Sequence, residues 1–377
     1  MTDLQHTLGL LGEAAQFDVC SRAGRPMPDG KPSDALERHV ELLTRSDGKR
    51  IPVLKVLQTS ACAKDCYYCP FRAGRDFRRA ALKPEDLARA TDELYRRGKI
   101  QGLFLSSGIV GKGEYTQEQI VKTAEILRSV YQFRGYLHLK LMPGSSEAAI
   151  ERTMELADRV STNLEAPTAQ ALEKLSGTKD LDSLIDPLKI AHRVAVSQGK
   201  RVSRTTQFVV GPGGESDRDL LARTSELYTA YGLARAYYSA FRPVMNTPLD
   251  GLEATPAARE HHLYQADFLM RQYGFAVDEL PFDPTGNLPP DQDPKVLWAQ
   301  THGDRFPVEV NRAGRETLLR VPGIGPLSAD RILAARRVRR VQSVEDLARL
   351  GVSVKRALPY ILLDGKRPPH QLSLFGI

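Results

Sequence analysis

The sequence predicts an α/β protein: an open, partial (β/α)6 barrel of the TIM type, followed by a small all-α domain. Two observations predict it. Between residues 51 and 280, short apolar segments that read as strands alternate with amphipathic segments that read as helices. Beyond a proline-rich stretch at 281–294, only helical patterns follow. Because only six strand–helix units precede that stretch, we expect a barrel that does not close on eight strands.

Six strands and six helices are expected in strict alternation. Alternation of this kind implies parallel strands with right-handed crossovers, so the carboxyl ends of the strands meet at one edge. In parallel barrels that edge carries the chemistry. The expected strands are 53–57, 102–105, 137–141, 160–164, 205–210 and 236–240, and the expected helical segments are 84–98, 116–132, 146–158, 168–198, 217–231 and 256–273.

The size and composition are those of a soluble globular chain. It has 377 residues, of which 41% are hydrophobic and 26% charged, enough for two or three domains. No apolar run reaches the roughly 20 residues of a membrane span. Residues 1–6 show neither a basic start nor an apolar signal core, so we expect a cytoplasmic protein. Four cysteines are too few for a disulfide scaffold.

Breaks in composition divide the chain into five parts. Residues 1–50 form a loop-rich N-terminal extension in which several prolines interrupt long elements. The barrel is expected at 51–280, a proline-rich linker at 281–304, a helical domain at 305–364 and a flexible tail at 365–377.

The basic charge lies at the C-terminal end. Residues 301–377 hold 14 Lys and Arg against 7 Asp and Glu. Subtracting these from the totals of 53 and 46 leaves 39 of each sign in residues 1–300. A neutral body with a basic appendage indicates a catalytic domain carrying a module for an anionic polymer. A solvated arginine-rich helix is the alternative.

Three cysteines stand close together after the first strand. Cys62, Cys66 and Cys69 have the spacing C-x3-C-x2-C, which can place three thiolates at three corners of one iron–sulfur cube. Such clusters commonly take four cysteine ligands, so three leave one iron open for another ligand. The alternatives are a structural zinc site and unrelated buried thiols. Cys20, 42 residues upstream of Cys62, is a distant fourth thiol whose default role is burial.

The segment Cys62-Ala63-Lys64-Asp65-Cys66-Tyr67-Tyr68-Cys69 resembles the signature of the radical S-adenosylmethionine (radical SAM) superfamily. The resemblance covers about residues 51–250 and implies a [4Fe–4S] cluster held by the three cysteines. In that family the open iron binds S-adenosylmethionine, and one electron from the reduced cluster cleaves it to methionine and a 5′-deoxyadenosyl radical. An electron donor is therefore an expected partner.

The same resemblance implies contacts to S-adenosylmethionine at the ends of later strands. Tyr68 would border the adenine, the turn after strand two would meet the methionine amino group, the end of strand four would contact the ribose, and a glycine-rich turn after strand five would lie beside the adenine. Ordinary turn chemistry is the alternative for each. The residues concerned are Tyr68, Ser106, Ser107, Gly108, Asn163, Glu165, Gly211 and Gly213.

Residues 318–337 resemble a helix-hairpin-helix element. A helix ends near Val321, and Gly323 and Gly325 would leave backbone N–H groups bare at the start of the next helix, a ready site for an anion such as a DNA phosphate. A weaker copy follows at 344–357. A helical packing module without nucleic acid is the alternative, and RNA remains open. The expected DNA-binding residues are Gly323, Gly325, Arg331, Arg336 and Arg337.

The tail ends in a short motif. Residues 371–375 read Gln-Leu-Ser-Leu-Phe and resemble the peptide by which bacterial polymerases and repair proteins dock on the DNA sliding clamp. Gln371, Leu372, Leu374 and Phe375 would contact the clamp. A tail folded back on its own domain is the alternative.

The whole combination resembles bacterial radical SAM proteins connected with DNA modification or repair. We therefore expect a cytoplasmic enzyme that generates a 5′-deoxyadenosyl radical to modify or repair DNA. Two alternatives are a radical SAM enzyme that modifies tRNA and a non-catalytic DNA- and clamp-bound Fe–S redox sensor. Tyr237, Tyr238 and Arg242 are candidates to line a substrate site, with core packing an equal reading for the tyrosines, whereas His261 and His262 are expected to be structural.

Overall fold

The computed structural model describes residues 3–18, 39–45 and 48–368. The chain divides into two compact units. The first comprises residues 1–215 and 223–256, and the second comprises 216–222 and 257–377. Cys20 and the motif at 371–375 lie outside the described residues, so the roles expected of them stay predictions.

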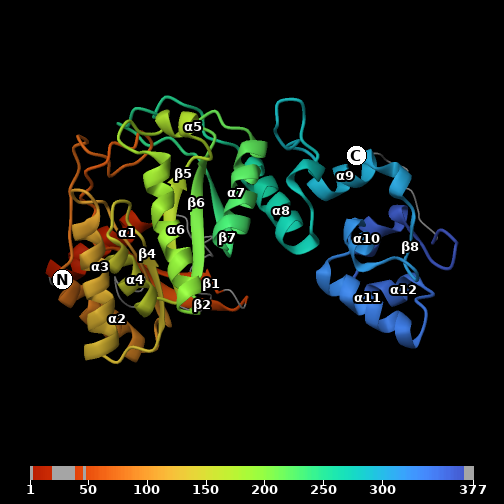
Figure 1. Cartoon of the computed structure of the whole chain (residues 1–377), viewed down its shortest axis with the longest axis horizontal. Coiled ribbons are helices and arrows are strands. Elements are labelled where there is room, and N and C mark those ends of the chain that lie inside the picture. Colours follow the sequence, from red (N-terminus) through yellow and green to blue (C-terminus); the bar gives the residue numbers. More distant parts are fainter. Residues whose placement is uncertain (1–2, 19–38, 46–47, 369–377) are drawn as a thin grey trace. The chain divides into compact units, whose positions relative to one another are not determined.

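A seven-stranded sheet organises the first unit (Figure 1). Its strands lie side by side in sequence order, β1 to β7. All neighbours from β2 onward pair in parallel, and β1 pairs antiparallel with β2. The strands are β1 (Val40–Thr44), β2 (Arg50–Leu57), β3 (Gly102–Ser106), β4 (Tyr136–Lys140), β5 (Arg159–Glu165), β6 (Ser203–Val210) and β7 (Arg235–Ala240).

The six parallel strands match the six expected ones to within three residues at each end. The expected α/β fold with an open, partial barrel is therefore confirmed, although the sheet curls into a half barrel where about three quarters of a barrel was expected. Strand β1 was not expected, because residues 1–50 read as loop-rich. The helices are α1 (Asp3–Ala15), α2 (Pro84–Arg96), α3 (Glu114–Glu125), α4 (Glu147–Leu156), α5 (Ala169–Glu173), α6 (Leu181–Ser197), α7 (Asp217–Tyr231) and α8 (Ala257–Tyr273), with a π-helical turn (Ile126–Val130) after α3.

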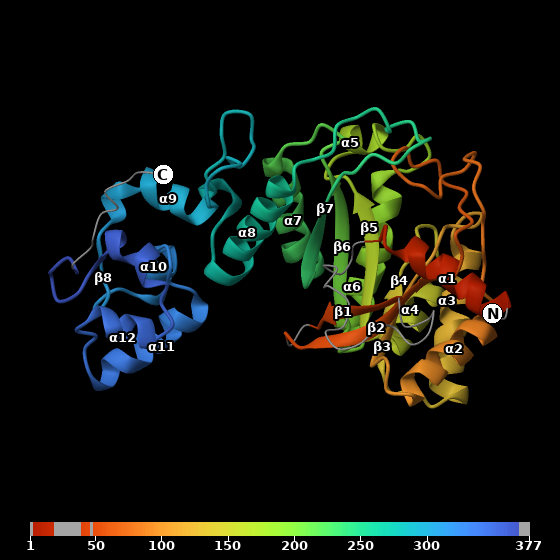
Figure 2. The same ribbon diagram turned by 180° about the vertical axis from the view of Figure 1, so that it is seen from behind.

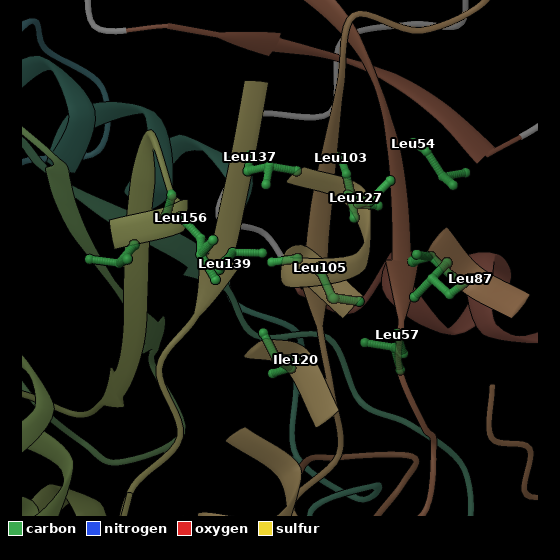
Figure 3. Close-up of a cluster of buried hydrophobic side chains, with 14 of the residues drawn as sticks. Leu54, Leu57, Leu87, Leu103, Leu105, Ile120, Leu127, Leu137, Leu139 and Leu156 are labelled. Atoms are coloured by element: carbon green, nitrogen blue, oxygen red, sulfur yellow. The ribbon is translucent and has the colours of Figure 1, made fainter. Parts of the chain in front are cut away.

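The outer face of the sheet is apolar and covered by helices. Every second residue along each strand points to this face and packs with buried side chains of α1 to α4 and α6. Figure 3 shows the strand leucines facing helical residues such as Leu87 and Ile120. Burial of the large aliphatic side chains in this cluster, each worth about 1.5–3 kcal/mol, holds the helices on the sheet.

The opposite, inner face is polar. Register pairing places Lys55, Phe104, His138, Arg159 and Ser203 in one row across β2 to β6. A second row, one step nearer the carboxyl ends, holds Lys140, Ser161, Thr205 and Arg235. Because side chains alternate along a strand, each strand serves both faces. The half barrel therefore has an apolar outside and a polar, mostly basic inside.

The second unit is mainly helical (Figure 2). Its fully buried Trp298 stacks on His302 in the α9 region and contacts Phe275 edge-on. Two short strands pair in parallel within it. Its further elements are α9 (Pro294–Thr301), β8 (Val308–Glu309), α10 (Arg315–Arg320), α11 (Pro326–Val338), α12 (Val344–Arg349), α13 (Val354–Ala357) and β9 (Ile361–Leu362).

The division of the chain differs from the expected boundaries. The second unit already includes α8, so the break falls at 256/257 instead of 280. The proline-rich segment is also not a simple linker, because Asp293 caps α9 through hydrogen bonds to the amides of Lys295 and Val296. Prolines at helix starts are compatible with helix, and this is why composition alone misread the segment. Within the described part of the chain, no helix has the length and apolarity to cross a membrane.

Two helical hairpins pack against each other at the end of the second unit. Helices α10 and α11 meet through Leu318, Val321 and Ile332, all fully buried. The turns of the two hairpins exchange hydrogen bonds: Ser353 N donates to Gly323 O (2.9 Å), and Ser328 Oγ donates to Gly351 O (2.6 Å). The two turn glycines share a φ of +84°, so the hairpins are local repeats of one geometry.

Candidate functional site: the cysteine loop

The three cysteines lie in the long connection between β2 and α2, at the carboxyl edge of the sheet. Cys66 is buried, and Cys62 and Cys69 are partly exposed. The amide of Ile109 points at Cys62 Sγ (3.4 Å), and the amide of Phe71 points at Cys69 Sγ (3.4 Å). Amide groups aimed at sulfur stabilise thiolates, the form that binds metal.

The protein surroundings of Cys66 and Cys69 favour the protonated thiols. Burial raises the pKa of Cys66, and burial together with the neighbouring Cys66 thiol raises the pKa of Cys69 to about 12. Three thiolates this close repel one another, so they need a shared positive charge to ionise together. A metal cluster supplies that charge, and the donor set fits one.

The described residues contain no group of three or more His, Cys, Asp or Glu side chains arranged to hold one ion. A cube does not need such convergence, because each of its three cysteine ligands binds a different iron atom. The arrangement is therefore compatible with the predicted cluster.

Asp65 fastens the cysteine loop to the connection between α5 and α6. Its Oδ1 accepts hydrogen bonds from Ser176 Oγ (2.5 Å), Thr178 Oγ1 (2.6 Å) and Thr178 N (3.3 Å). Its Oδ2 accepts one from Gly177 N (3.1 Å). Burial acts to raise the pKa of Asp65, but these hydrogen bonds outweigh it and lower the pKa. Every hydrogen bond needs an acceptor on Asp65, so the ionised carboxylate is the form that holds the loop.

Two further contacts complete this attachment. Tyr67 N donates to Leu175 O (2.7 Å), and Lys64 Nζ donates to Thr178 O (3.3 Å). Gly177 allows the close approach, because a Cβ there would lie 2.9 Å from Tyr67 Oη. The segment before Cys69 is thus held on its outer side by residues 175–178.

Arg79 holds the other end of the same loop. Its guanidinium donates to four backbone carbonyls, which are those of Ser60, Phe71, Arg72 and Arg75, over 2.9–3.4 Å. The same guanidinium lies 4.5 Å from the centroid of the Phe77 ring. One planar group therefore joins the start and the end of the loop around the cysteines.

A buried ion pair stands next to Cys66. Lys179 Nζ donates to Glu165 Oε1 (2.8 Å), and the two side chains are 8% and 5% exposed. Glu165 ends β5 after a register shift and has a φ of +64°, a strained value for a residue with a side chain. Its Oε2 is buried and has no hydrogen-bond partner in the part of the chain that the structure describes. Burial and the charge of Glu165 raise the pKa of Tyr68 well above its usual value, which places Tyr68, Glu165 and Lys179 in one cluster beside the thiols.

The turn after β3 packs on the cysteine loop. Gly108 N donates to Thr59 O (2.7 Å), and a Cβ on Gly108 would lie 2.2 Å from Ala61 O. The glycine is thus explained by this backbone approach. Ser107 Oγ donates to its neighbour Gly108 O, and Ser106 Oγ donates to Asp18 Oδ2 (2.6 Å). The backbone of Ser106 also contacts this connection, because Gln58 N donates to Ser106 O (2.8 Å).

The remaining expected contact residues lie on β5 and after β6. Asn163 Oδ1 accepts a hydrogen bond from Lys140 Nζ (2.7 Å) on the inner face. Gly211 has a φ of +112°, and a Cβ there would lie 2.1 Å from Thr255 Oγ1. A Cβ on Gly213 would lie 2.8 Å from Glu215 Oε2. Local packing explains both glycines, and the cofactor contacts expected of them stay predictions.

The other residues selected from the sequence fall in different places. Tyr238 is fully buried, and its hydroxyl is 2.8 Å from Thr224 Oγ1. Tyr237 lies on the inner face, and Arg242 is exposed. His262 is buried in α8, within the second unit, as expected for a structural histidine.

Sequence reasoning did not select Asp65, Arg79 or Lys179. Asp65 lies inside the cysteine motif, which is a signal that could have found it. The partners of Arg79 are backbone carbonyls, and the burial of Lys179 follows from the fold, so a pattern of residue types shows neither.

Comparison with known proteins agrees with this geometry. The family model described as the Radical SAM superfamily matches residues 56–223, which contain the cysteine loop and the strands from β3 to β6. This match supports membership of the Radical SAM superfamily. Radical SAM proteins use a [4Fe–4S] cluster and S-adenosylmethionine, and Cys62, Cys66 and Cys69 fit the CxxxCxxC motif that holds the cluster.

Several solved structures align with part of this chain. The FeFe-hydrogenase maturase HydG from Carboxydothermus hydrogenoformans is 14% identical, with a TM-score of 0.45 over 57% of this chain and 50% of that one. Coproporphyrinogen III oxidase (HemN) from Escherichia coli is 12% identical, with a TM-score of 0.39 over 64% and 56%. Methylornithine synthase (PylB) is 13% identical, with a TM-score of 0.47 over 57% and 60%.

The chain therefore spans less than two thirds of each of these three proteins. No curated protein sequence gives a significant match. Any inference about the substrate and partners must therefore be drawn from the residues of this chain.

The Asp65 attachment generates a prediction. In Asp65→Asn, an amide NH2 group replaces one of the two carboxylate oxygens. Because NH2 cannot accept the hydrogen bond that this oxygen accepted, at least one hydrogen bond is lost, and the attachment of the loop weakens by about 1–3 kcal/mol. We expect faster hydrogen exchange in residues 60–75 and less iron per chain after anaerobic reconstitution. Mass spectrometry and iron analysis measure the two effects.

Asp86→Asn is the control, because Asp86 pairs with Arg89 on the surface of α2. The difference in exchange and iron content between wild type and Asp65→Asn is present at neutral pH and is lost as the pH falls through the lowered pKa of Asp65. Below that pKa the carboxyl of the wild type is protonated, and it then accepts fewer hydrogen bonds, as the amide does. Unchanged exchange in residues 60–75 together with full iron content would contradict the role of Asp65.

Proposed function

We propose that this chain is a radical SAM enzyme that modifies or repairs DNA. The observation that carries the first half is the match of residues 56–223 together with the C-x3-C-x2-C loop. The second half is supported by the basic hairpins of the second unit. A cytoplasmic location is part of the same proposal, because a strongly reducing cluster requires reducing surroundings.

In this family the bound cluster and S-adenosylmethionine supply a 5′-deoxyadenosyl radical that removes a hydrogen atom from the substrate. The chain's own residues would hold these groups in a defined place. Cys62, Cys66 and Cys69 would bind three irons, while Asp65 and Arg79 position the loop. Tyr68, Glu165 and the turn at 211–214 are proposed to contact S-adenosylmethionine.

The hairpins of the second unit present the features of a phosphate site. Gly325 is the N-cap of the 13-residue helix α11 and provides no side-chain cap, so the first amides of α11 stay available. Arg331 and Arg337 of the same helix are exposed and have no carboxylate partner among the described residues. Lys355, which follows the glycine turn of the second hairpin, is also exposed. Bare amides beside unpaired cations favour a polyanion.

Arg336 fits this role less well. Its guanidinium donates to Val310 O (2.9 Å) and Ala313 O (2.7 Å), so it joins α11 to the segment after β8. We therefore propose Gly323, Gly325, Arg331 and Arg337 as the DNA contacts and assign Arg336 mainly to packing.

Product formation tests the first half of the proposal. Anaerobically reconstituted protein incubated with dithionite and S-adenosylmethionine should release 5′-deoxyadenosine, measured by liquid chromatography. Cys66→Ala should lower the yield at least 100-fold, because a ligand of the cluster is lost. If reconstituted wild-type protein binds iron but forms no 5′-deoxyadenosine, the redox-sensor alternative is favoured.

DNA binding tests the second half. Replacing Arg331 or Arg337 by Ala should weaken binding to duplex DNA of any sequence and lower the slope of log K against log salt by about one. The emission of Trp298, the single tryptophan, checks that the second unit is folded. Arg315→Ala is the control, because Arg315 is already paired with Asp330 (2.7 Å). Tight binding of tRNA with weak binding of duplex DNA would reverse the choice of substrate.

We also propose that Gln371, Leu372, Leu374 and Phe375 bind the bacterial sliding clamp. Nonspecific DNA contacts are weak, about 10⁻⁴–10⁻⁶ M, and a second attachment raises the effective concentration. A chain lacking residues 370–377 should lose capture by purified clamp while keeping its DNA affinity. Capture at the wild-type level would refute this role.

A further inference from the structure

The inner face of the half barrel carries a group of buried polar atoms that have no hydrogen-bond partner within residues 3–18, 39–45 and 48–368. They lie near the amino ends of β4, β5 and β6, remote along the strands from the cysteine loop. Register pairing makes His138 and Arg159 neighbours, and Arg159 and Ser203 neighbours, with adjacent strands about 4.8 Å apart. The atoms are Tyr136 Oη, His138 Nδ1, Arg159 Nε, Ser203 Oγ and Thr205 Oγ1.

Arg159 is the central member of this group. The residue is 4% exposed and has no carboxylate partner among the described residues. Its only hydrogen bonds there are long ones, to Thr44 O (3.3 Å) and Tyr237 Oη (3.5 Å). A buried charge without a counter-charge is costly, and such groups in native proteins are paired or bind a ligand.

The acidic groups near this face are already occupied. Glu41 pairs with Lys55 (3.1 Å), and Asp18 pairs with Lys140 (3.0 Å). Asp158, which precedes Arg159, accepts from Leu137 N and pairs with Arg128 (3.2 Å). The lysines of the inner face are thus neutralised locally, whereas Arg159 is not.

The unpartnered atoms can act as donors together. Arg159 Nε–H can only donate, and the hydroxyls of Tyr136, Ser203 and Thr205 can each donate. The ring of Tyr136 lies 6.0 Å from the Arg159 guanidinium, and Ser203 is the register partner of Arg159 on β6. A group of donors around an uncompensated cation is complementary to an oxyanion.

We propose that Arg159, with Tyr136, Ser203 and Thr205, binds an oxyanion of the phosphate or carboxylate type on the inner face of the half barrel. The site needs neither the cluster nor the second unit, so it stands independently of the function proposed above. If that function holds, the oxyanion is a part of the substrate remote from the reacting atom.

Thermal unfolding of the full-length protein with sodium phosphate, sodium acetate or sodium chloride at matched ionic strength tests the site. At a phosphate concentration about 100-fold above its Kd, the Tm should rise by about 5 °C over the chloride value. Hydrogen exchange should slow in β4, β5 and β6, which separates this site from phosphate on the basic second unit. An equal or larger effect of acetate would identify a carboxylate as the ligand.

Arg159→Met keeps the length of the side chain and removes its charge. Its Tm in chloride should equal or exceed that of wild type, since an unpaired buried charge is removed, while the response to phosphate disappears. Ser203→Ala, the milder variant, should weaken phosphate binding about tenfold. Arg193→Met, at an exposed arginine of α6, should respond as wild type does. A wild-type chain with no phosphate response in β4 to β6, or a response that persists in Arg159→Met, overturns the proposal.

Discussion

The alternation of side chains along the parallel strands is the constraint on which the first unit depends. Each of the six strands must bury one face against helices and turn the other inward. Leu103 and Leu105 on β3 belong to the apolar core, and Phe104 between them belongs to the polar inner row. This division creates an interior where lysine, arginine and histidine side chains are held without an aqueous surface. The same topology brings the carboxyl ends of all six strands to one edge, where the cysteine loop lies.

The cysteine loop has little regular structure, and its geometry comes from side chains elsewhere. Asp65 ties it to residues 176–178, and Arg79 closes it through four carbonyl groups. The strained end of β5 presents Glu165 to Lys179 beside Cys66. Strain and buried charge at one place are typical of a functional site, since each costs free energy that folding alone does not require.

The second unit uses its charge differently. Its hairpins are held by an apolar core, by reciprocal contacts of the two glycine turns, and by the buried Lys295, whose Nζ donates to Ile324 O (2.7 Å) in the first turn. Arg331, Arg337 and Lys355 are exposed there. Charge that the fold does not use is what a polyanion-binding surface requires, and effective concentration would let two weak attachments act together.

The sequence by itself determined the six parallel strands, the cysteine motif and the two hairpins, because each is encoded by local spacing: apolar alternation, three thiols within eight residues, and glycines at helix junctions. It could not show strand β1 or the inclusion of α8 in the second unit, because these follow from packing between distant segments. The helix within the proline-rich segment does have a local signal, Asp293 before Pro294, which composition alone conceals. The roles of Asp65, Lys179 and Arg159 were likewise decided by the tertiary structure. Their importance lies in burial and in which partners they gain or lack, and both are properties of the folded chain.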